Sequence, residues 1–97
     1  MKTVLVRPAA AADIEEAFFW YEGQLPGLGD EFREELKAVL DRVSERPELY
    51  QVLHRDTRRA LLKRFPYGLF YRVYPEAIVV VAVMHARRSP RRWRSRT

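Results

Sequence analysis

Cysteine is absent from this 97-residue sequence, which excludes disulfide bonds and any chemistry that needs a thiolate. Histidine is scarce: His54 and His85 are the only two, and they fit no metal-ligand spacing. None of the serines stands in a nucleophile-elbow context, and no glycine-rich phosphate loop is present. We therefore expect neither a bound metal nor another cofactor.

Long apolar runs are also missing. The longest, 77–84, has eight residues, far below the roughly 20 needed to span a bilayer. The start of the chain is interrupted by Arg7-Pro8 too early to form a signal peptide. The length suits one domain, residues 1–97, with one modest core. We expect a cytoplasmic protein.

Charge is distributed unevenly along the chain. Residues 1–50 contain six Lys/Arg and eleven Asp/Glu, a net of −5, whereas residues 51–97 contain twelve Lys/Arg and two Asp/Glu, a net of +10. Such asymmetry points to an anionic partner for the second half, or to an acidic protein that masks it.

Two amphipathic helices are predicted in the first half. Helical spacing brings Ile14, Ala17, Phe18 and Tyr21 onto one face of a helix that follows Pro8 and runs to about Gly23. A second apolar stripe follows the glycine-rich turn 23–29, in a helix that Pro47 ends near Arg46; it consists of Phe32, Leu36, Val39, Leu40 and Val43. Such a helical hairpin must bury its stripes against another apolar layer.

The second half supplies that layer as strands. An antiparallel meander is predicted from strands 58–65, 69–74 and 77–85, with 3–6 as a short N-terminal strand and 48–57 as a connecting loop. The last strand is apolar on both faces and is therefore expected inside the sheet. The predicted fold is α+β, in the order β-α-α-β-β-β, with the hairpin on one face of a small, mainly antiparallel sheet and a short basic tail.

The basic tail is the most informative segment for binding. Arginines crowd the tail, and Trp93 lies among them; arginine suits phosphate or carboxylate, and an aromatic residue can stack on bases. Packing of Trp93 on the sheet explains its presence equally well. Phe19 and Trp20 fall partly off the first helical stripe, and we expect them at the edge of the core.

Taken together, the chain resembles the RelE/ParE superfamily of type II toxins. The resemblance spans nearly the whole chain and rests on Asp13-Ile-Glu-Glu16 with Tyr21, Gly27-Leu-Gly-Asp-Glu-Phe32, Pro47, Arg64-Phe-Pro-Tyr67, Tyr71-Arg72-Val73, and Ala82-Val-Met-His85 with Arg87-Arg88, Pro90 and Trp93. It implies a small sheet packed on a helical hairpin, a role in toxin-antitoxin and plasmid-stabilisation systems, and an antitoxin that wraps and neutralises the toxin.

Residues typical of the ribonuclease branch of the superfamily are missing from this chain. The ribonuclease branch carries two strand lysines, a strand arginine and a tail tyrosine; the corresponding positions here are Arg59 and Leu61, Gly68, and Trp93 or Arg94. Cleaving RNA through its own 2′-OH needs a base, an acid and cations, and this chain keeps the cations but, His85 apart, loses most proton-transfer candidates. The pattern is more similar to the ParE branch, which is described as poisoning DNA gyrase.

The leading hypothesis is thus a non-enzymatic, ParE-like toxin that binds gyrase and is neutralised by a ParD-like antitoxin. For the target surface the candidates are Arg64, Arg72, His85, Arg87, Arg88 and Trp93; for the antitoxin they are Phe19, Trp20, Arg72 and Arg88. The alternative is a ribosome-dependent mRNA endonuclease of RelE type, with His85 as acid or base and Arg64 and Arg88 on the phosphate. A third hypothesis is a non-toxic nucleic-acid-binding module.

Overall fold

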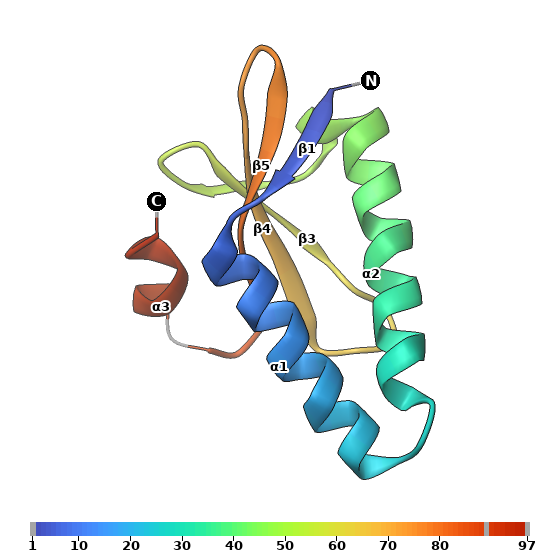
Figure 1. Cartoon of the computed structure of the whole chain (residues 1–97). Helices are drawn as coiled ribbons and strands as arrows, with labels where there is room; N and C mark the ends of the chain where they lie inside the picture. The colour runs from blue at the N-terminus through green and yellow to red at the C-terminus, as the bar shows by residue number, and fades with distance from the viewer. Residues whose placement is uncertain (1, 89, 97) are drawn as a thin grey trace.

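A helical hairpin covers one face of a five-stranded sheet, and a short third helix lies on the other side (Figure 1). The structure is a computed structural model that describes residues 2–88 and 90–96. The elements are β1 (Thr3–Val6), α1 (Pro8–Gln24), α2 (Leu28–Glu45), the 3-10 turn η1 (Pro47–Leu49), β2 (Val52–His54), β3 (Thr57–Leu61), β4 (Tyr67–Val73), β5 (Ala77–His85) and α3 (Pro90–Arg94). The predicted α+β class and element order are confirmed.

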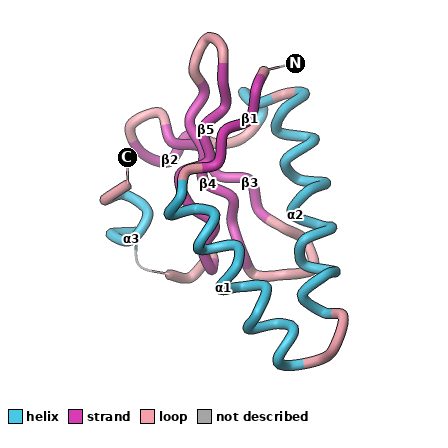
Figure 2. The backbone as a smooth tube through the Cα atoms, in the orientation of Figure 1, coloured by secondary structure: helices cyan, strands magenta, loops and turns pink. Residues whose placement is uncertain are grey.

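The sheet has the strand order β1-β5-β4-β3-β2 (Figure 2). β1 runs parallel to β5, and the remaining neighbours are antiparallel. β5 therefore lies inside the sheet, as its two apolar faces predict. The ladder between β4 and β5 shifts register between Phe70 and Tyr71, whose partners are Ala82 and Val80; the extra residue, Val81, forms a β-bulge.

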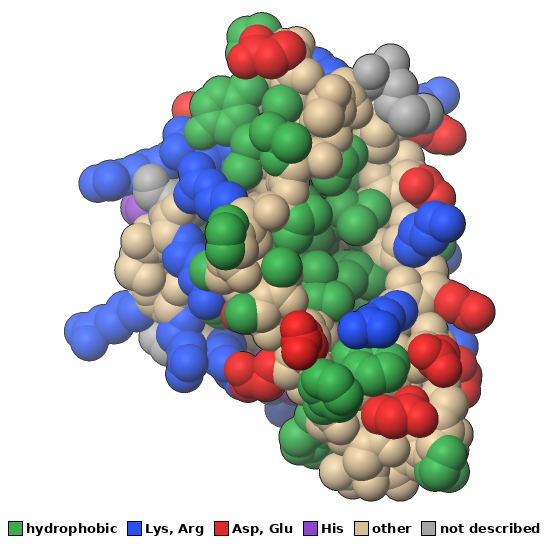
Figure 3. All heavy atoms as spheres, viewed as in Figure 1, with side chains coloured by type: hydrophobic (Ala, Val, Ile, Leu, Met, Phe, Trp, Pro, Cys, Tyr) green, Lys and Arg blue, Asp and Glu red, His purple; other side chains and the backbone are tan. Residues whose placement is uncertain are grey.

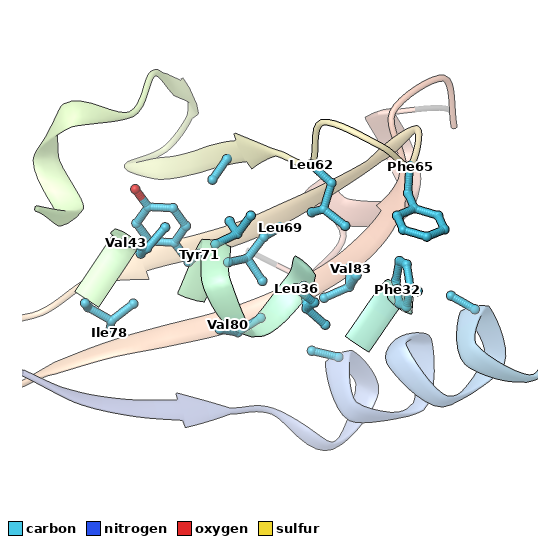
Figure 4. Close-up of a cluster of buried hydrophobic side chains, with 14 of the residues drawn as sticks. Phe32, Leu36, Val43, Leu62, Phe65, Leu69, Tyr71, Ile78, Val80 and Val83 are labelled. Carbon is cyan, nitrogen blue, oxygen red and sulfur yellow. The ribbon is translucent and has the colours of Figure 1, made fainter. Parts of the chain in front are cut away.

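The helical stripes and one face of the sheet form the main core (Figure 4). From α2 it receives Phe32, Leu36, Val39 and Val43, and from β4 and β5 Leu69, Tyr71, Ile78, Val80 and Val83. A smaller cluster on the opposite face contains Phe70, Val81, Ala82, Met84 and Trp93. Since both faces of β5 are covered, its continuous apolar sequence is explained.

The turn between the two helices is held by a carboxylate. Glu22, near the end of α1, accepts hydrogen bonds from the backbone N–H groups of Gly27 (2.9 Å) and Gly29 (3.0 Å) at the start of α2. Gly27 has φ +91°, a left-handed conformation that favours glycine. Among the described residues, no helix combines the length and apolar character needed to cross a membrane.

Asp13 and Arg96 complete the edge of β5 where β1 ends. The Asp13 carboxylate accepts a hydrogen bond from the Val83 N–H (3.0 Å), and the Arg96 guanidinium donates to the Val81 carbonyl (3.3 Å). The two side chains also form an ion pair with each other. Asp13 thus satisfies the Val83 N–H, which would otherwise be unpaired, and so has a structural role.

Two details of the predicted strands are wrong. Residues 48–57, expected as a loop, contain η1 and the short strand β2; the hairpin turn at Arg55 and Asp56 adopts positive φ without the Asn-Gly or Asp-Gly sequence that usually signals it. β3 ends at Leu61 rather than Phe65. Beyond it, the Lys63 and Arg64 N–H groups donate to the Glu35 carboxylate of α2 instead of a strand.

Replacing Tyr71 with Phe should reduce the free energy of unfolding by about 1–2 kcal/mol. The ring is fully buried, and its hydroxyl donates a 2.6 Å hydrogen bond to the Pro47 carbonyl. Urea unfolding at pH 7 measures the loss. Tyr74→Phe is the control, because the Tyr74 hydroxyl has no hydrogen-bond partner among the described residues; an equal loss in both variants would contradict the assigned role.

The same pair of variants tests a pH effect. Burial raises the pKa of Tyr71 above its ordinary value, so the unfolded chain ionises first, at about pH 10. The stability that the protonated hydroxyl contributes is complete below that pH and is lost as the pH rises toward the folded-state pKa. The difference in unfolding free energy between wild type and Tyr71→Phe should therefore shrink above about pH 10.

Candidate functional site

An open groove of about 750 Å³ lies between the last turns of α1, the start of β4 and the end of β5. We call it the α1–β5 groove. It is lined by Glu16, Phe19, Trp20, Tyr21, Pro66, Tyr67, His85, Arg87 and Arg88. Its lining combines aromatic side chains, chiefly from the helix, with cations from the end of the last strand.

The aromatic wall comes from the last turns of α1. Tyr21 turns inward and is buried, whereas its neighbours Phe19 and Trp20 are 61% and 59% exposed. The expectation that these two residues pack at the edge of the core is therefore wrong. Two large, adjacent, exposed aromatic side chains beside a cavity are typical of an interaction site.

Tyr67 forms the inner part of the groove at the start of β4. Its ring contacts those of Tyr21 (centroids 5.9 Å apart) and His85 (5.7 Å). Partial burial raises the pKa of Tyr67, while Arg88 acts in the opposite direction and Glu16 and Asp13 reinforce the rise. At neutral pH the groove thus holds a protonated phenol next to an arginine.

The basic rim is the turn that follows β5. The Arg88 N–H donates to the His85 carbonyl (2.9 Å), and the Arg87 N–H donates to His85 Nδ1 (3.1 Å). Because Nδ1 accepts a hydrogen bond, the ring proton of neutral His85 lies on Nε2. Among the described carboxylates, none forms an ion pair with Arg87 or Arg88, so both remain available to an external anion.

The structure brings together only part of the predicted site. His85, Arg87 and Arg88 share the groove with Phe19 and Trp20. Residues predicted to contact the target and residues predicted to contact the antitoxin therefore line the same groove. The sequence alone did not predict that they lie together.

The other three candidates lie elsewhere. Arg64 forms an ion pair with Glu31 of α2 and lines a different cleft. Arg72 stands opposite Thr57 in the strand ladder, and its guanidinium carbon lies 5.7 Å from the Tyr74 ring centroid. Trp93 is only 6% exposed and stacks on Phe70 at 4.9 Å; of the two interpretations of this residue, the structure shows the packing one.

Sequence reasoning missed Tyr67 and Glu16 as lining residues. Tyr67 belongs to the Arg64–Tyr67 motif, and strand pairing places it directly opposite His85; only that cross-strand pairing, which no local pattern reveals, marks it as part of the site. Among the described residues, no group of three or more His, Asp and Glu side chains is arranged to hold a metal ion.

The fold and this groove define a small α+β domain with an aromatic and basic groove, and comparison with known proteins identifies its family. Residues 4–90 match the family described as the ParE toxin of type II toxin-antitoxin system, parDE. The toxin ParE2 of Mycobacterium tuberculosis is 32% identical over 79 residues, which cover 80% of this chain and 75% of that protein. The chain therefore belongs to the ParE toxin family of type II toxin-antitoxin systems.

Solved structures share the fold. The intact E. coli RelBE toxin-antitoxin complex contains a chain with a TM-score of 0.69 and 25% identity, covering 91% of this chain and 100% of that one. The chromosomal ParDE system of P. aeruginosa gives a TM-score of 0.66 at 15% identity, over 88% of this chain and 96% of that one. Because likeness extends to both a RelE-type and a ParE-type assembly, fold alone does not distinguish the two branches.

The two tryptophans provide a matched test of exposed against buried aromatic residues. Trp20→Ala should change the free energy of unfolding by no more than about 0.5 kcal/mol, since Trp20 is exposed. Trp93→Ala should reduce it by about 3 kcal/mol, because it removes the ring stacked on Phe70. Urea unfolding followed by circular dichroism checks both; a large loss for Trp20→Ala would show that Trp20 is a core residue.

Proposed function

We propose that this chain is a toxin that arrests growth by binding DNA gyrase in the cytoplasm, and that a ParD-like antitoxin neutralises it by covering the α1–β5 groove. The single observation that carries the proposal is the composition of the groove. It offers exposed aromatic surface and two arginines that form no ion pair with a described carboxylate; these residue types dominate protein–protein contacts.

The groove is less suited to cleaving RNA. A general base and a general acid must flank the reacting phosphate with cations nearby. His85 Nδ1 already accepts the Arg87 N–H, and Arg64, the second predicted phosphate contact, is paired with Glu31 in another cleft. The ribonuclease hypothesis puts Arg64 and Arg88 on one phosphate beside His85, and the pairing of Arg64 with Glu31 argues against it.

One observation favours the ribonuclease alternative. Tyr67, His85 and Arg88 line the same groove, and the Tyr67 phenol is protonated at neutral pH, as a general acid must be. A protonated phenol, an imidazole and an arginine are the kinds of group that RNA cleavage uses. The two functions therefore need an experiment that separates them.

Purified chain should inhibit supercoiling of relaxed plasmid by gyrase, and its induced expression should arrest growth while ribosome-bound mRNA stays uncut in primer extension. Arg88→Ala should weaken inhibition roughly tenfold or more, because it removes an unpaired groove cation. Lys37→Ala, an equal loss of charge on an exposed face of α2, is the control and should match wild type. Codon-phased mRNA cuts that disappear in His85→Ala would overturn the gyrase proposal in favour of the endonuclease.

Antitoxin binding is supported by charge and by the solved relatives. E. coli RelBE is a toxin-antitoxin complex and P. aeruginosa ParDE a toxin-antitoxin system. In this chain Lys and Arg side chains gather mainly on the side of α3, whereas Asp and Glu lie mainly over the helical hairpin (Figure 3). An antitoxin segment that presents an apolar side chain to Trp20 and a carboxylate to Arg88 complements the groove.

Trp93→Phe provides a fluorescence assay for this contact, because it keeps an aromatic ring on Phe70 and leaves Trp20 as the only tryptophan. Titration with the cognate antitoxin should shift the Trp20 emission to shorter wavelength as the ring is buried. Adding Arg88→Ala should weaken binding roughly 30-fold. An antitoxin that binds tightly without changing Trp20 emission would place its contact outside the groove.

A further inference from the structure

Gly68 is a glycine inside β4, the middle strand of the sheet, and it is buried. Glycine within a strand loses conformational entropy on folding and provides no side chain to pack, so it usually marks a place where another group comes close. Here that group is identified. A Cβ atom at position 68 would lie 3.1 Å from both Cγ and Cδ of Arg59 and 3.4 Å from Phe70 Cε1.

The stem of Arg59 therefore occupies the space that a side chain at position 68 would fill. Arg59 stands directly opposite Phe70 in the ladder, and Gly68 lies two residues earlier in β4, opposite Leu61. The stem consequently runs diagonally over the sheet, toward the end where Tyr67 pairs with His85. It lies on the face of Phe70 and Trp93, the reverse of the face that carries the helices.

The charge of Arg59 is not neutralised by any carboxylate that the structure describes. No carboxylate among the described residues forms an ion pair with it, and residues 51–97 contain only Asp56 and Glu76 as acids. Arg72 lies on the same face, two residues beyond Phe70 in β4. Packing of the stem on the Gly68 backbone restricts the side chain before any partner arrives, and such preorganisation lowers the entropy cost of binding.

We propose that this outer face of the sheet is a second binding surface, on which Arg59, seated over Gly68, contacts a carboxylate of the protein target. The inference rests on the proposed gyrase-binding function and deepens it. The charge of the face fits an acidic protein surface, and its position behind the sheet separates it from the α1–β5 groove. Loss of the Arg59 charge should then reduce toxicity without weakening antitoxin binding, whereas loss of Arg88 from the groove should weaken both.

Gly68→Ala is the sharpest test. Position 68 is extended rather than left-handed, so alanine is tolerated and the melting temperature should stay equal or rise. The added methyl group must nevertheless displace the Arg59 stem by a few tenths of an ångström, because 3.1 Å is too close for two carbon atoms. We expect weaker gyrase inhibition and growth arrest in a protein that is no less stable, a combination that unfolding does not explain.

Two further variants define the cause. Arg59→Met keeps a long apolar stem over Gly68 but removes the charge; it should reduce gyrase inhibition and growth arrest roughly tenfold or more and leave antitoxin affinity within about twofold. Combining Arg59→Met with Gly68→Ala should add little to Arg59→Met alone, since both act through one side chain. Gly23→Ala is the matched control, because a Cβ there meets nothing within 4 Å; it should leave both activities unchanged.

Three results would overturn the proposal. Full growth arrest by Arg59→Met would show that the charge is not used. Loss of antitoxin binding in Arg59→Met would assign the residue to the antitoxin interface instead. Binding of an RNA or DNA oligonucleotide that depends on Arg59, with gyrase binding unaffected, would assign it to nucleic acid. Failure of wild type to inhibit gyrase refutes the proposed target, while growth arrest by the variants still decides the role of Arg59.

Discussion

The packing of four aromatic rings at one end of the molecule is the interaction on which the site depends. Tyr21 of α1 stacks on Phe32 of α2 and meets Phe65 and Tyr67 edge-on. Phe32 in turn contacts Phe65 and Tyr67. Such pairs contribute about 0.5–1.5 kcal/mol each beyond the area they bury, and here they join both helices to the sheet where the hairpin turns.

This aromatic cluster also explains why the groove exists. With Tyr21 fixed inward, its neighbours Phe19 and Trp20 point to other sides of the same helix and stay exposed. With Tyr67 fixed against Tyr21, the paired His85 is brought beside the end of α1. The core thus positions both the aromatic wall and the basic rim, so the site is largely formed before a partner binds.

Much of the fold could be predicted from sequence because it follows local rules. The stripes of α1 and α2 obey helical spacing, and the two-sided apolar run of β5 implies an interior strand. What could not be predicted depends on contacts between distant residues. Glu35 of α2 ends β3 by capturing the N–H groups of Lys63 and Arg64, and Glu31 removes Arg64 from the site. The sequence pattern near residues 63–64 does not predict contacts with those two carboxylates, which lie about thirty positions earlier in the chain.

The site was predicted less well for the same reason. His85, Arg87 and Arg88 are contiguous in sequence and stay together in space, but Arg72 and Trp93 lie on the reverse face of the sheet. The arginine content predicts an anionic partner but does not indicate which face of the sheet that partner contacts. Strand alternation predicts that Arg72 and Phe70 share one face of β4. Only the structure shows that this is the face opposite the helical hairpin, and that Trp93 of α3 covers part of it.

Gly68 shows how the structure changes the argument about activity. From sequence, a missing side chain where a ribonuclease carries an arginine suggests that a phosphate-binding charge has been lost. In the structure the space over Gly68 is filled by the stem of Arg59, so this face of the sheet still carries a cation, which comes from the neighbouring strand β3.

The missing side chain at position 68 is therefore weak evidence against RNA cleavage. The stronger evidence is the separation of the two candidate phosphate contacts: Arg64 is paired with Glu31 and lines another cleft, whereas Arg88 lines the α1–β5 groove. A cation can reach the same part of this face from either of two neighbouring strands, whereas proton transfer requires an acid or base at hydrogen-bond distance from the reacting atom.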